Sequence, residues 1–149
     1  YAVLTTKHHD GVTLWDAPGT DGEAHDVAGP LGLAGALPPG LDLGLLGGAR
    51  ELCLLNNRTC EAHRPPTPHW YLYMIAVAPE ARGTGTGSAL LRHGLERVDA
   101  DGVPAHLEST SPGSRRLYER LGFEQVAVLD APPLPSAYWA MTRPANDHR

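Results

Sequence analysis

Hydrophobic residues change their spacing within one stretch of the chain, from every position to every third or fourth. An apolar run at 71–77, rich in aromatic and β-branched residues, predicts a strand that is buried on both faces. A glycine-rich turn follows at 82–87, and beyond it Leu91, Leu95 and Val98 recur at helical spacing, with charged residues between them. The pattern therefore predicts a strand, a glycine-rich loop and an amphipathic helix in direct succession.

Shorter patterns on both sides of this stretch complete a mixed α/β arrangement. They predict strands at 1–6, 11–15, 104–108, 123–129 and 138–142, and helices at 49–62 and 114–121. Asp10 and Gly11 are the expected turn between the first two strands, and Gly122 is the expected left-handed cap of the last helix. Residues 17–49 are dense in proline and glycine yet carry six leucines, which indicates loops and short helical turns packed against other parts of the chain. A length of 149 residues predicts a single domain, 1–149.

The glycine-rich loop has the features of an anion-binding site. A strand, a glycine loop and a helix start together aim unpaired N–H groups and the positive end of a helix dipole at one point, where a pyrophosphate fits. The Walker pattern is excluded because the loop has no lysine. The dinucleotide fingerprint is excluded because Gly83, Gly85 and Gly87 are spaced G-x-G-x-G and no acidic residue ends a second strand about 20 residues later.

Two motifs give the chain a resemblance to a known family. Arg82, Gly85 and Gly87 match Arg/Gln-x-x-Gly-x-Gly/Ala, which is motif A of the GCN5-related N-acetyltransferases (GNAT). Downstream, LESTSPGSRRLYERLGFEQV resembles motif B of the same family, whose hallmark is Leu-Tyr-Glu-x-Leu-Gly-Phe after a strand that ends in Leu-Glu. The sequence of these motifs is most similar to the antibiotic-modifying branch that includes puromycin N-acetyltransferase. In that branch a His-Arg-Pro segment precedes motif A, as it does at 63–65 here.

The resemblance implies a fold and a division of the chain. It implies a mixed, mostly antiparallel central sheet that is splayed and flanked by helices. An acetyl-CoA-binding core is expected at 70–143, preceded at 1–69 by a hairpin and a variable cover on the acceptor side. The family's usual first strand and two helices have no counterpart here, so either the domain is shortened, another chain supplies the sheet edge, or the N-terminus of the sequence is incomplete.

The resemblance also implies roles for individual residues. Those expected to hold the coenzyme are Ile75, Ala76 and Val77 along the pantetheine arm, Arg82, Gly83, Thr84, Gly85, Thr86, Gly87 and Ser88 around the pyrophosphate, and Ser114, where the family often has asparagine. An N–H group near Ile75 would polarise the acetyl carbonyl. Tyr118 would protonate the departing sulfur, or pack beneath the sheet. Glu108 would accept the proton of the amine, anchor an ammonium group or cap a loop, and His69 and His106 are further candidates for the base.

The formal net charge of −5 is unevenly distributed. Residues 82–120 carry six arginines against five acidic residues, a balance of +1, so the rest of the chain has a balance of −6. Phosphate binding must then be local, through N–H groups and nearby arginines, and the acidic remainder favours a cationic substrate. Nucleic acid is disfavoured because no basic face could follow its phosphate backbone.

The positions of cysteine, histidine and apolar residues bear on disulfide bonds, metal binding and membrane insertion. Cys53 and Cys60 share a predicted helix with Cα atoms roughly 10 Å apart, too far for a disulfide, and are expected to be small buried apolar groups. His8 and His9 are adjacent with no third ligand near them, so no metal site is predicted. The sequence has no run of 18 apolar residues and no visible signal peptide, which predicts a cytoplasmic protein without a membrane span.

The combined prediction is an acetyl-CoA-dependent N-acetyltransferase. The expected acceptor is the primary amine of a small cationic molecule, either an antibiotic or a biosynthetic amine. Direct attack in a ternary complex is expected rather than an acyl-enzyme, because neither cysteine is near the predicted site in sequence, and a homodimer is compatible with this function. Two alternatives stay open: a non-catalytic module that binds acyl-CoA, and an enzyme that transfers a different acyl group.

Overall fold

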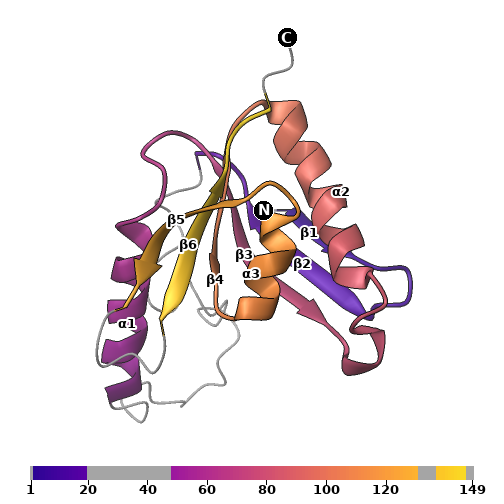
Figure 1. Ribbon diagram of the computed structural model, residues 1–149, viewed down its shortest axis with the longest axis horizontal. Helices are drawn as coiled ribbons and strands as arrows, with labels where there is room; N and C mark the ends of the chain where they lie inside the picture. Colours follow the sequence, from indigo (N-terminus) through magenta and orange to yellow (C-terminus); the bar gives the residue numbers. More distant parts are fainter. Residues whose placement is uncertain (1, 20–47, 131–136, 147–149) are drawn as a thin grey trace, which may run out of the picture.

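The structure, a computed structural model, describes residues 2–19, 48–130 and 137–146, with the side chains of 48–54 left aside. The described residues form a six-stranded sheet of order β1-β2-β3-β4-β6-β5 with three α-helices and one 3₁₀ helix (Figure 1). The strands are β1 Ala2–Thr5, β2 Gly11–Asp16, β3 Trp70–Val77, β4 Ala105–Ser109, β5 Glu124–Leu129 and β6 Tyr138–Arg143. The helices are α1 Gly48–Glu61, η2 Pro79–Ala81, α2 Thr86–Asp101 and α3 Pro112–Glu119.

The predicted fold class is confirmed. Within the described sheet, β3 and β4 run parallel and the other neighbouring strands run antiparallel. The element predicted at 114–121 begins earlier, at Pro112, because Ser111 is the residue that caps it: its side chain accepts a hydrogen bond from Ser114 N. Most of the leucine-rich segment predicted to cover the acceptor, residues 20–47, lies outside the described residues.

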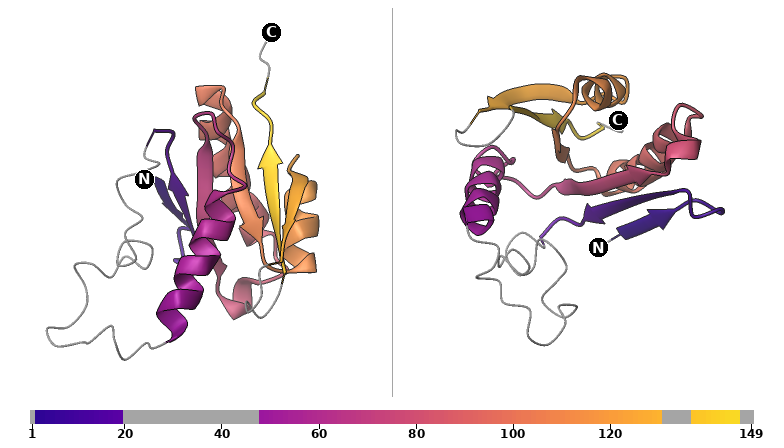
Figure 2. Two further views of the ribbon diagram at one scale, coloured as in Figure 1. Left: turned by 90° about the vertical axis from the view of Figure 1, so that its left-hand side faces the viewer. Right: turned by 90° about the horizontal axis from the view of Figure 1, so that it is seen from below.

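The helices cover the two faces of the sheet unequally, as Figures 1 and 2 show. The main core joins Leu91 and Val98 of α2 to Leu107 of β4 and Met141 of β6, and α3 belongs to the same core. A smaller cluster on the other face joins Cys60 of α1 to Leu129 of β5 and Ala140 of β6. Because neighbouring strand residues point to opposite faces, the pair Ala140 and Met141 shows that α1 lies across the sheet from α2 and α3.

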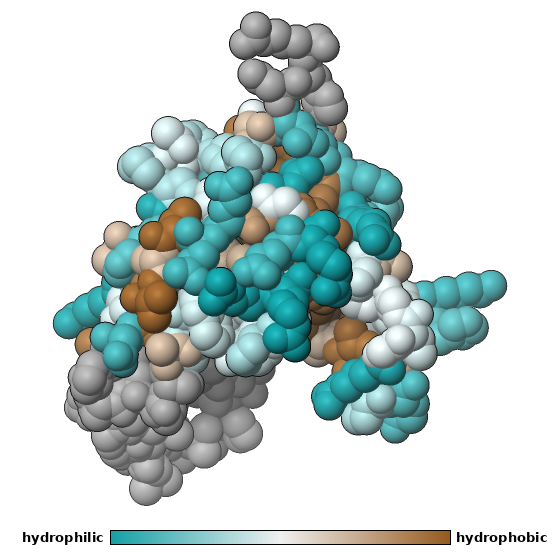
Figure 3. Space-filling view, viewed as in Figure 1, coloured by the Kyte–Doolittle hydropathy of each residue, from teal (hydrophilic) through white to brown (hydrophobic). Residues whose placement is uncertain are grey.

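The surface of this layered fold is largely polar on the face shown in Figure 3, with apolar residues in small separate areas. Among the described residues the exposed large hydrophobic side chains are Val3, Met74, Val126 and Val128. Of these, only Met74 lies on a central strand. Its exposure reflects a break in the middle of the sheet.

The sheet is splayed between β3 and β4. β3 pairs with β2 from Tyr71 to Val77, but it pairs with β4 only at Trp70 and Tyr71. The right-hand view of Figure 2 shows the β1-β2-β3 part and the β4-β6-β5 part as two diverging halves. The prediction that 71–77 is buried on both faces is therefore wrong after Leu72: Met74 is 45% exposed, and β4 does not pair with β3 at this position.

A β-bulge accompanies the splay. Trp15 of β2 pairs with Leu72 and Leu14 pairs with Met74, so Tyr73 is an extra residue on β3. The bulge shifts the alternation of the strand. Leu72 packs in the core beneath α2, and the next residue that packs against this core is Ile75 rather than Met74.

The hairpin between β1 and β2 turns at a different residue from the one predicted. His9 adopts a left-handed backbone with φ 56°, whereas Gly11 is already part of β2. Gly11 is needed there for a different reason: a Cβ atom at this position would lie 2.8 Å from Leu90 Cδ1 and 3.1 Å from Thr86 Cγ2 of α2. Close packing of helix on strand, and not turn geometry, explains this glycine.

Candidate active site

The loop from η2 to α2 presents a cluster of unpaired backbone N–H groups. Gly83 and Gly85 have positive φ angles of 76° and 93°, and Gly85 is the N-cap of α2 without a side-chain cap. The first hydrogen bond of the helix runs from Ala89 N to Gly85 O at 3.0 Å. Within the described part of the chain, no group accepts a hydrogen bond from the N–H groups of 83–88. Such a cluster at a helix N-terminus fits a pyrophosphate.

Side chains stabilise the shape of this loop without blocking it. Thr84 Oγ1 donates to Ala81 O at 2.7 Å and shares a 2.9 Å hydrogen bond with Thr86 Oγ1. Arg82 Nε donates to Val77 O at 3.2 Å, which holds its exposed side chain along the end of β3. Gly87 is helical, and a Cβ atom there would make an ordinary 3.6 Å contact with Val77 Cγ2. The fold itself therefore does not require glycine at position 87.

The free edge of β3 leads away from this loop. Ala78 N donates to Asp10 O at 2.7 Å, so Ala78 directs its N–H group toward β2. Because backbone N–H groups alternate in direction along a strand, those of Ile75 and Val77 point away from β2, into the gap that faces β4. This is the edge along which an extended ligand arm could add as a further strand.

A cavity of about 310 Å³ lies at the other end of the gap. α1 and the turn after it, β3, β4 and β6 all contribute to its wall. It is lined by Asn56, Asn57, Cys60, Glu61, Arg64, Tyr71, Tyr73, Met74, Glu108, Thr110 and Tyr138. The wall thus combines three tyrosines with two carboxylates and one guanidinium group.

Glu108 is the buried carboxylate of this cavity. Tyr71 Oη donates to Glu108 Oε2 at 2.6 Å, and His106 Nε2 lies 3.4 Å from Glu108 Oε1. Oε1 and Nε2 are both buried and neither makes a hydrogen bond, so we treat this contact as electrostatic. Burial opposes ionisation of Glu108, but His106, Tyr71 and the charge of Arg64 outweigh it and hold the pKa of Glu108 below its usual range. Glu108 is therefore a carboxylate at neutral pH, and its buried Oε1 accepts no hydrogen bond from a described residue.

Two buried histidines, His106 and His69, lie next to each other near Glu108. His106 is fully buried and its Nδ1 shares a 2.8 Å hydrogen bond with Thr142 Oγ1. His69 is 3% exposed, its Nδ1 lies 2.8 Å from Thr67 O, and its ring meets that of His106 edge-on with centroids 6.1 Å apart. Nε2 of each ring is buried without a hydrogen-bond partner. Of the two histidines considered as bases, His106 is the one in contact with Glu108.

Tyr118 is the buried residue of α3, on the opposite face of the sheet. Its side chain is 5% exposed and packs edge-on against Phe123, with ring centroids 6.0 Å apart. Burial raises the pKa of Tyr118 to about 12, so the phenol is protonated at neutral pH. Its hydroxyl makes no hydrogen bond with a described residue. The structure thus shows the packing role expected for this tyrosine, and leaves its hydroxyl available as a donor.

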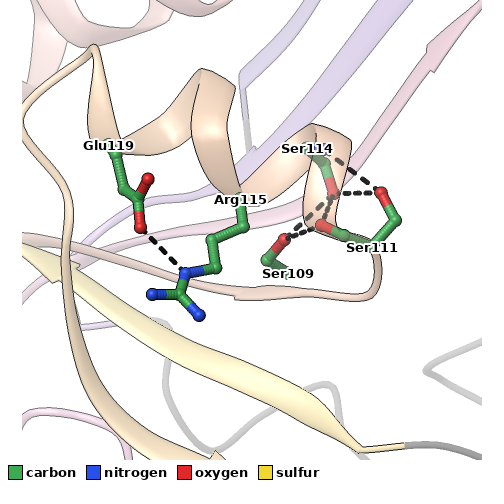
Figure 4. A network of polar contacts seen from close by, with 5 residues as sticks. All are labelled: Ser109, Ser111, Ser114, Arg115 and Glu119. Carbon is green, nitrogen blue, oxygen red and sulfur yellow. Dashed lines mark hydrogen bonds and ion pairs between the residues drawn. The ribbon is translucent and has the colours of Figure 1, made fainter.

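Ser114 belongs to a hydroxyl network at the start of α3 (Figure 4). Its Oγ shares hydrogen bonds with Ser109 Oγ at 2.9 Å and with Ser111 Oγ at 2.8 Å, and its N–H donates to Ser111 Oγ at 3.2 Å. The hydroxyl is thus engaged in capping the helix. In the same view Arg115 Nε pairs with Glu119 at 2.8 Å.

Sequence reasoning missed part of this site. Cys60 was expected to be remote from it, but it lies on the cavity wall. Arg64 and Tyr71 also line the cavity, a role that neither the His-Arg-Pro segment nor the strand pattern indicates. A signal was present: Asn56, Cys60 and Arg64 recur every fourth residue, which places them on one side of the helix that ends at Glu61 and the turn after it.

The remaining sequence features do not form sites in the described structure. No three His, Cys, Asp or Glu side chains among the described residues are grouped to hold a metal ion. None of the described helices has the length and apolar character needed to cross a bilayer.

Comparison with known proteins agrees with the geometry of the loop and the splayed sheet. The model of the acetyltransferase (GNAT) family matches residues 48–123. The chain belongs to this family. The predicted GNAT resemblance is therefore confirmed, while its puromycin-modifying branch stays a prediction.

Individual GNAT relatives cover parts of the chain. Mycothiol acetyltransferase of Thermomonospora curvata is 36% identical over 42% of this chain and 22% of its own length. L-2,4-diaminobutyric acid acetyltransferase of Nocardia farcinica is 37% identical over 48% of this chain and 39% of its own length. The chain thus spans less than half the length of these two curated relatives.

A solved structure matches nearly the whole chain. It is described as histone acetyltransferase HPA2 and related acetyltransferase from Corynebacterium glutamicum, with a TM-score of 0.59, 30% identity, and coverage of 97% of this chain and 63% of its own. Mosquito arylalkylamine N-acetyltransferase-like 5b has a TM-score of 0.57 at 17% identity, with coverage of 91% of this chain and 68% of its own, and shares the fold.

Proposed function

We propose that this GNAT chain is an acetyl-CoA-dependent N-acetyltransferase acting on a primary amine of a small molecule. The observation that carries the proposal is the free edge of β3. It runs from the unpaired N–H groups of 83–88 to the cavity that contains Glu108. This arrangement gives a coenzyme and an acceptor separate entrances to one gap.

The residues along this edge fit the coenzyme. The N–H groups of 83–88 would hold the pyrophosphate, with Arg82 beside it, and the strand edge at Ile75, Ala76 and Val77 would lie along the pantetheine arm. Acetyl-CoA supplies an acetyl group activated as a thioester. The N–H group of Ile75 would donate to the acetyl oxygen, where negative charge develops during transfer. Ser114 would contribute little to coenzyme binding, since its hydroxyl already takes part in the hydrogen-bond network that caps α3.

Residues on the two faces of the gap would handle protons. Glu108, which is ionised and lines the cavity, would bind the incoming ammonium and take its proton, and His106 Nε2 lies 3.4 Å from its Oε1. The hydroxyl of Tyr118 would donate to the departing sulfur. An acyl-enzyme on Cys60 is disfavoured, because burial and the charge of Glu108 raise the pKa of its thiol to about 12 and keep it neutral. Direct transfer in a ternary complex is the proposed route.

The acceptor class is argued from charge and size. Glu61 and Glu108 outnumber Arg64 on the cavity wall, which favours an acceptor that carries an ammonium group. The Nocardia farcinica relative is named for a small diamine acid, which agrees with a small-molecule acceptor. An antibiotic or a biosynthetic amine stays the prediction for its identity, as do a cytoplasmic location and a homodimer.

The test is to follow free thiol while the protein is incubated with acetyl-CoA and a panel of primary amines. Thiol release that depends on the amine, with the acetylated amine identified by mass spectrometry, is expected. Tight binding of CoA without thiol release for any amine would instead favour a non-catalytic acyl-CoA-binding module. Faster release from propionyl-CoA or succinyl-CoA than from acetyl-CoA would favour the transfer of another acyl group.

A further inference from the structure

Arg64 stands on the cavity wall without a salt bridge to a described residue, although the carboxylates of Glu108 and Glu61 line the same wall. Its Cζ lies 3.8 Å from the centre of the Tyr71 ring, so the guanidinium group stacks on that ring. Its Nε is buried and makes no hydrogen bond. Within the described chain, Arg64 has no carboxylate within ion-pair distance.

The neighbouring carboxylate is already held by another group. Glu108 accepts the hydroxyl of Tyr71 at one oxygen, so the ring of Tyr71 stands between the guanidinium group stacked on its face and the carboxylate bonded to its edge. Cation and anion are thereby kept apart on one wall, each with hydrogen-bonding capacity unused. An arginine that is half-buried and unpaired at an open cavity is a site for an anionic group of a ligand, since its planar fork matches a carboxylate.

We propose that the acceptor carries a carboxylate as well as its amine, and that Arg64 binds this carboxylate while Glu108 receives the amine. This inference rests on the proposed function and narrows its substrate to amino acids and related amino-carboxylates. A phosphate is disfavoured as the anionic group, because its second negative charge would face both Glu61 and Glu108. Tyr71 sets the spacing between the two binding groups.

The experiment compares amino acids with the amines that differ from them only by loss of the carboxylate. Suitable pairs are lysine and cadaverine, phenylalanine and phenethylamine, and methionine and 3-(methylthio)propylamine. Rates of thiol release give kcat/KM for each compound, and calorimetry without acetyl-CoA gives its affinity for the protein directly. We expect the acid of at least one pair to exceed its amine about tenfold or more in both measurements, as for one charged hydrogen bond.

The variant Arg64→Met separates this role from general packing. It should lower kcat/KM and affinity for the acid about tenfold or more while it changes those for the matched amine about twofold or less. Arg64→Lys should recover part of the discrimination, since it retains the charge without the planar fork. Arg58→Met is the control, because Arg58 is an exposed arginine on α1, the helix that precedes Arg64, and does not line the cavity. Thermal unfolding of each variant checks that the fold is intact.

The outcomes distinguish this inference from the function on which it rests. If in every pair the amine is acetylated at the same rate as its acid, or if an acid preference survives in Arg64→Met, the role of Arg64 is overturned and the acetyltransferase function is left intact. If no compound releases thiol, the proposed function fails, and the role of Arg64 is then judged from the calorimetric affinities alone. In that case, if the acid binds to the wild type and Arg64→Met abolishes this binding, an amino-carboxylate site is still supported. Equal binding of acid and amine overturns it.

Discussion

At the scale of single residues, Tyr118 combines a buried ring with a hydroxyl that no described residue engages. Its pKa near 12 lies well above that of a free thiol, about 8.5, so the phenol donates a hydrogen bond to a thiolate more readily than it loses its proton. Tyr118→Phe should lower kcat about 10²-fold with nearly unchanged affinity for acetyl-CoA, measured by thiol release and calorimetry. An unaffected rate would remove Tyr118 as the donor. A large loss of stability in Tyr118→Phe would contradict the absence of a hydrogen bond between this hydroxyl and the described residues.

Glu108 makes a second prediction at this scale, through pH. The pKa of Glu108 is lower in the folded protein than in the unfolded chain, so its ionisation stabilises the fold above the unfolded pKa, about 4.3. That contribution is lost as the pH falls through the folded pKa. The difference in melting temperature between the wild type and Glu108→Gln should therefore be largest near pH 7, with the wild type more stable. The difference should shrink below about pH 4. A difference that is constant from pH 7 to pH 3 would show that the carboxylate gains nothing from its surroundings.

At the scale of elements, helix α2 has a left-handed glycine at each end, which provides a matched pair of variants. Gly85 caps its N-terminus with φ 93° and Gly102 its C-terminus with φ 63°, and a Cβ atom would have open space at both. Alanine at either position should cost about 1 kcal/mol of stability from the left-handed backbone. Gly85→Ala should also weaken CoA binding, whereas Gly102→Ala should leave it unchanged. Equal CoA affinities, measured by calorimetry, would contradict the pyrophosphate site at this loop.

The middle of α2 depends on a glycine for packing. A Cβ atom at Gly94 would lie 2.5 Å from Trp15 Nε1 and 2.7 Å from Cε2, and Trp15 is 1% exposed. Overpacking typically costs 1–3 kcal/mol, more than the roughly 1 kcal/mol that alanine gains over glycine in a helix. Gly94→Ala should therefore destabilise the protein in urea unfolding. Gly87→Ala in the same helix, with ordinary contacts at 3.6 Å, should not, and equal stabilities would show that Trp15 moves freely.

The elements themselves followed from the sequence wherever the hydrophobic pattern was strong. Leu91, Leu95 and Val98 are buried as their helical spacing predicted. The pattern failed where a partner strand is missing, because an apolar run predicts a buried strand whether or not both edges are paired, and Met74 is exposed by the splay. It also gave no sign of the bulge at Tyr73, since bulges depend on register with a strand distant in sequence.

At the scale of the whole molecule, the two ends of the site differed in how far the sequence could predict them. The loop at 82–88 is local, so its motif predicted the arrangement of N–H groups that the structure displays. The cavity is assembled from α1, the turn after it and three strands, and the contact between Tyr71 and Glu108 spans 37 positions of the chain. Spacing along the sequence carries no information on such a contact. Only the four-residue repeat of Asn56, Cys60 and Arg64 indicated which face of α1 lies toward it. The chemical roles of all these residues stay predictions.

The splay joins these two ends into one continuous site, and amide hydrogen exchange can test that continuity. N–H groups of Met74 and Ala76 point toward β2, whereas those of Ile75 and Val77 point into the gap and lack a strand partner on that side. A coenzyme arm lying along β3 should therefore slow exchange at Ile75 and Val77, and in the loop at 83–88, far more than at Met74 and Ala76. Stabilisation of the whole fold by ligand binding acts on all four strand amides through global unfolding, so it cannot produce this alternation. Exchange at Ile75 and Val77 that is unchanged by a saturating concentration of CoA would place the coenzyme elsewhere.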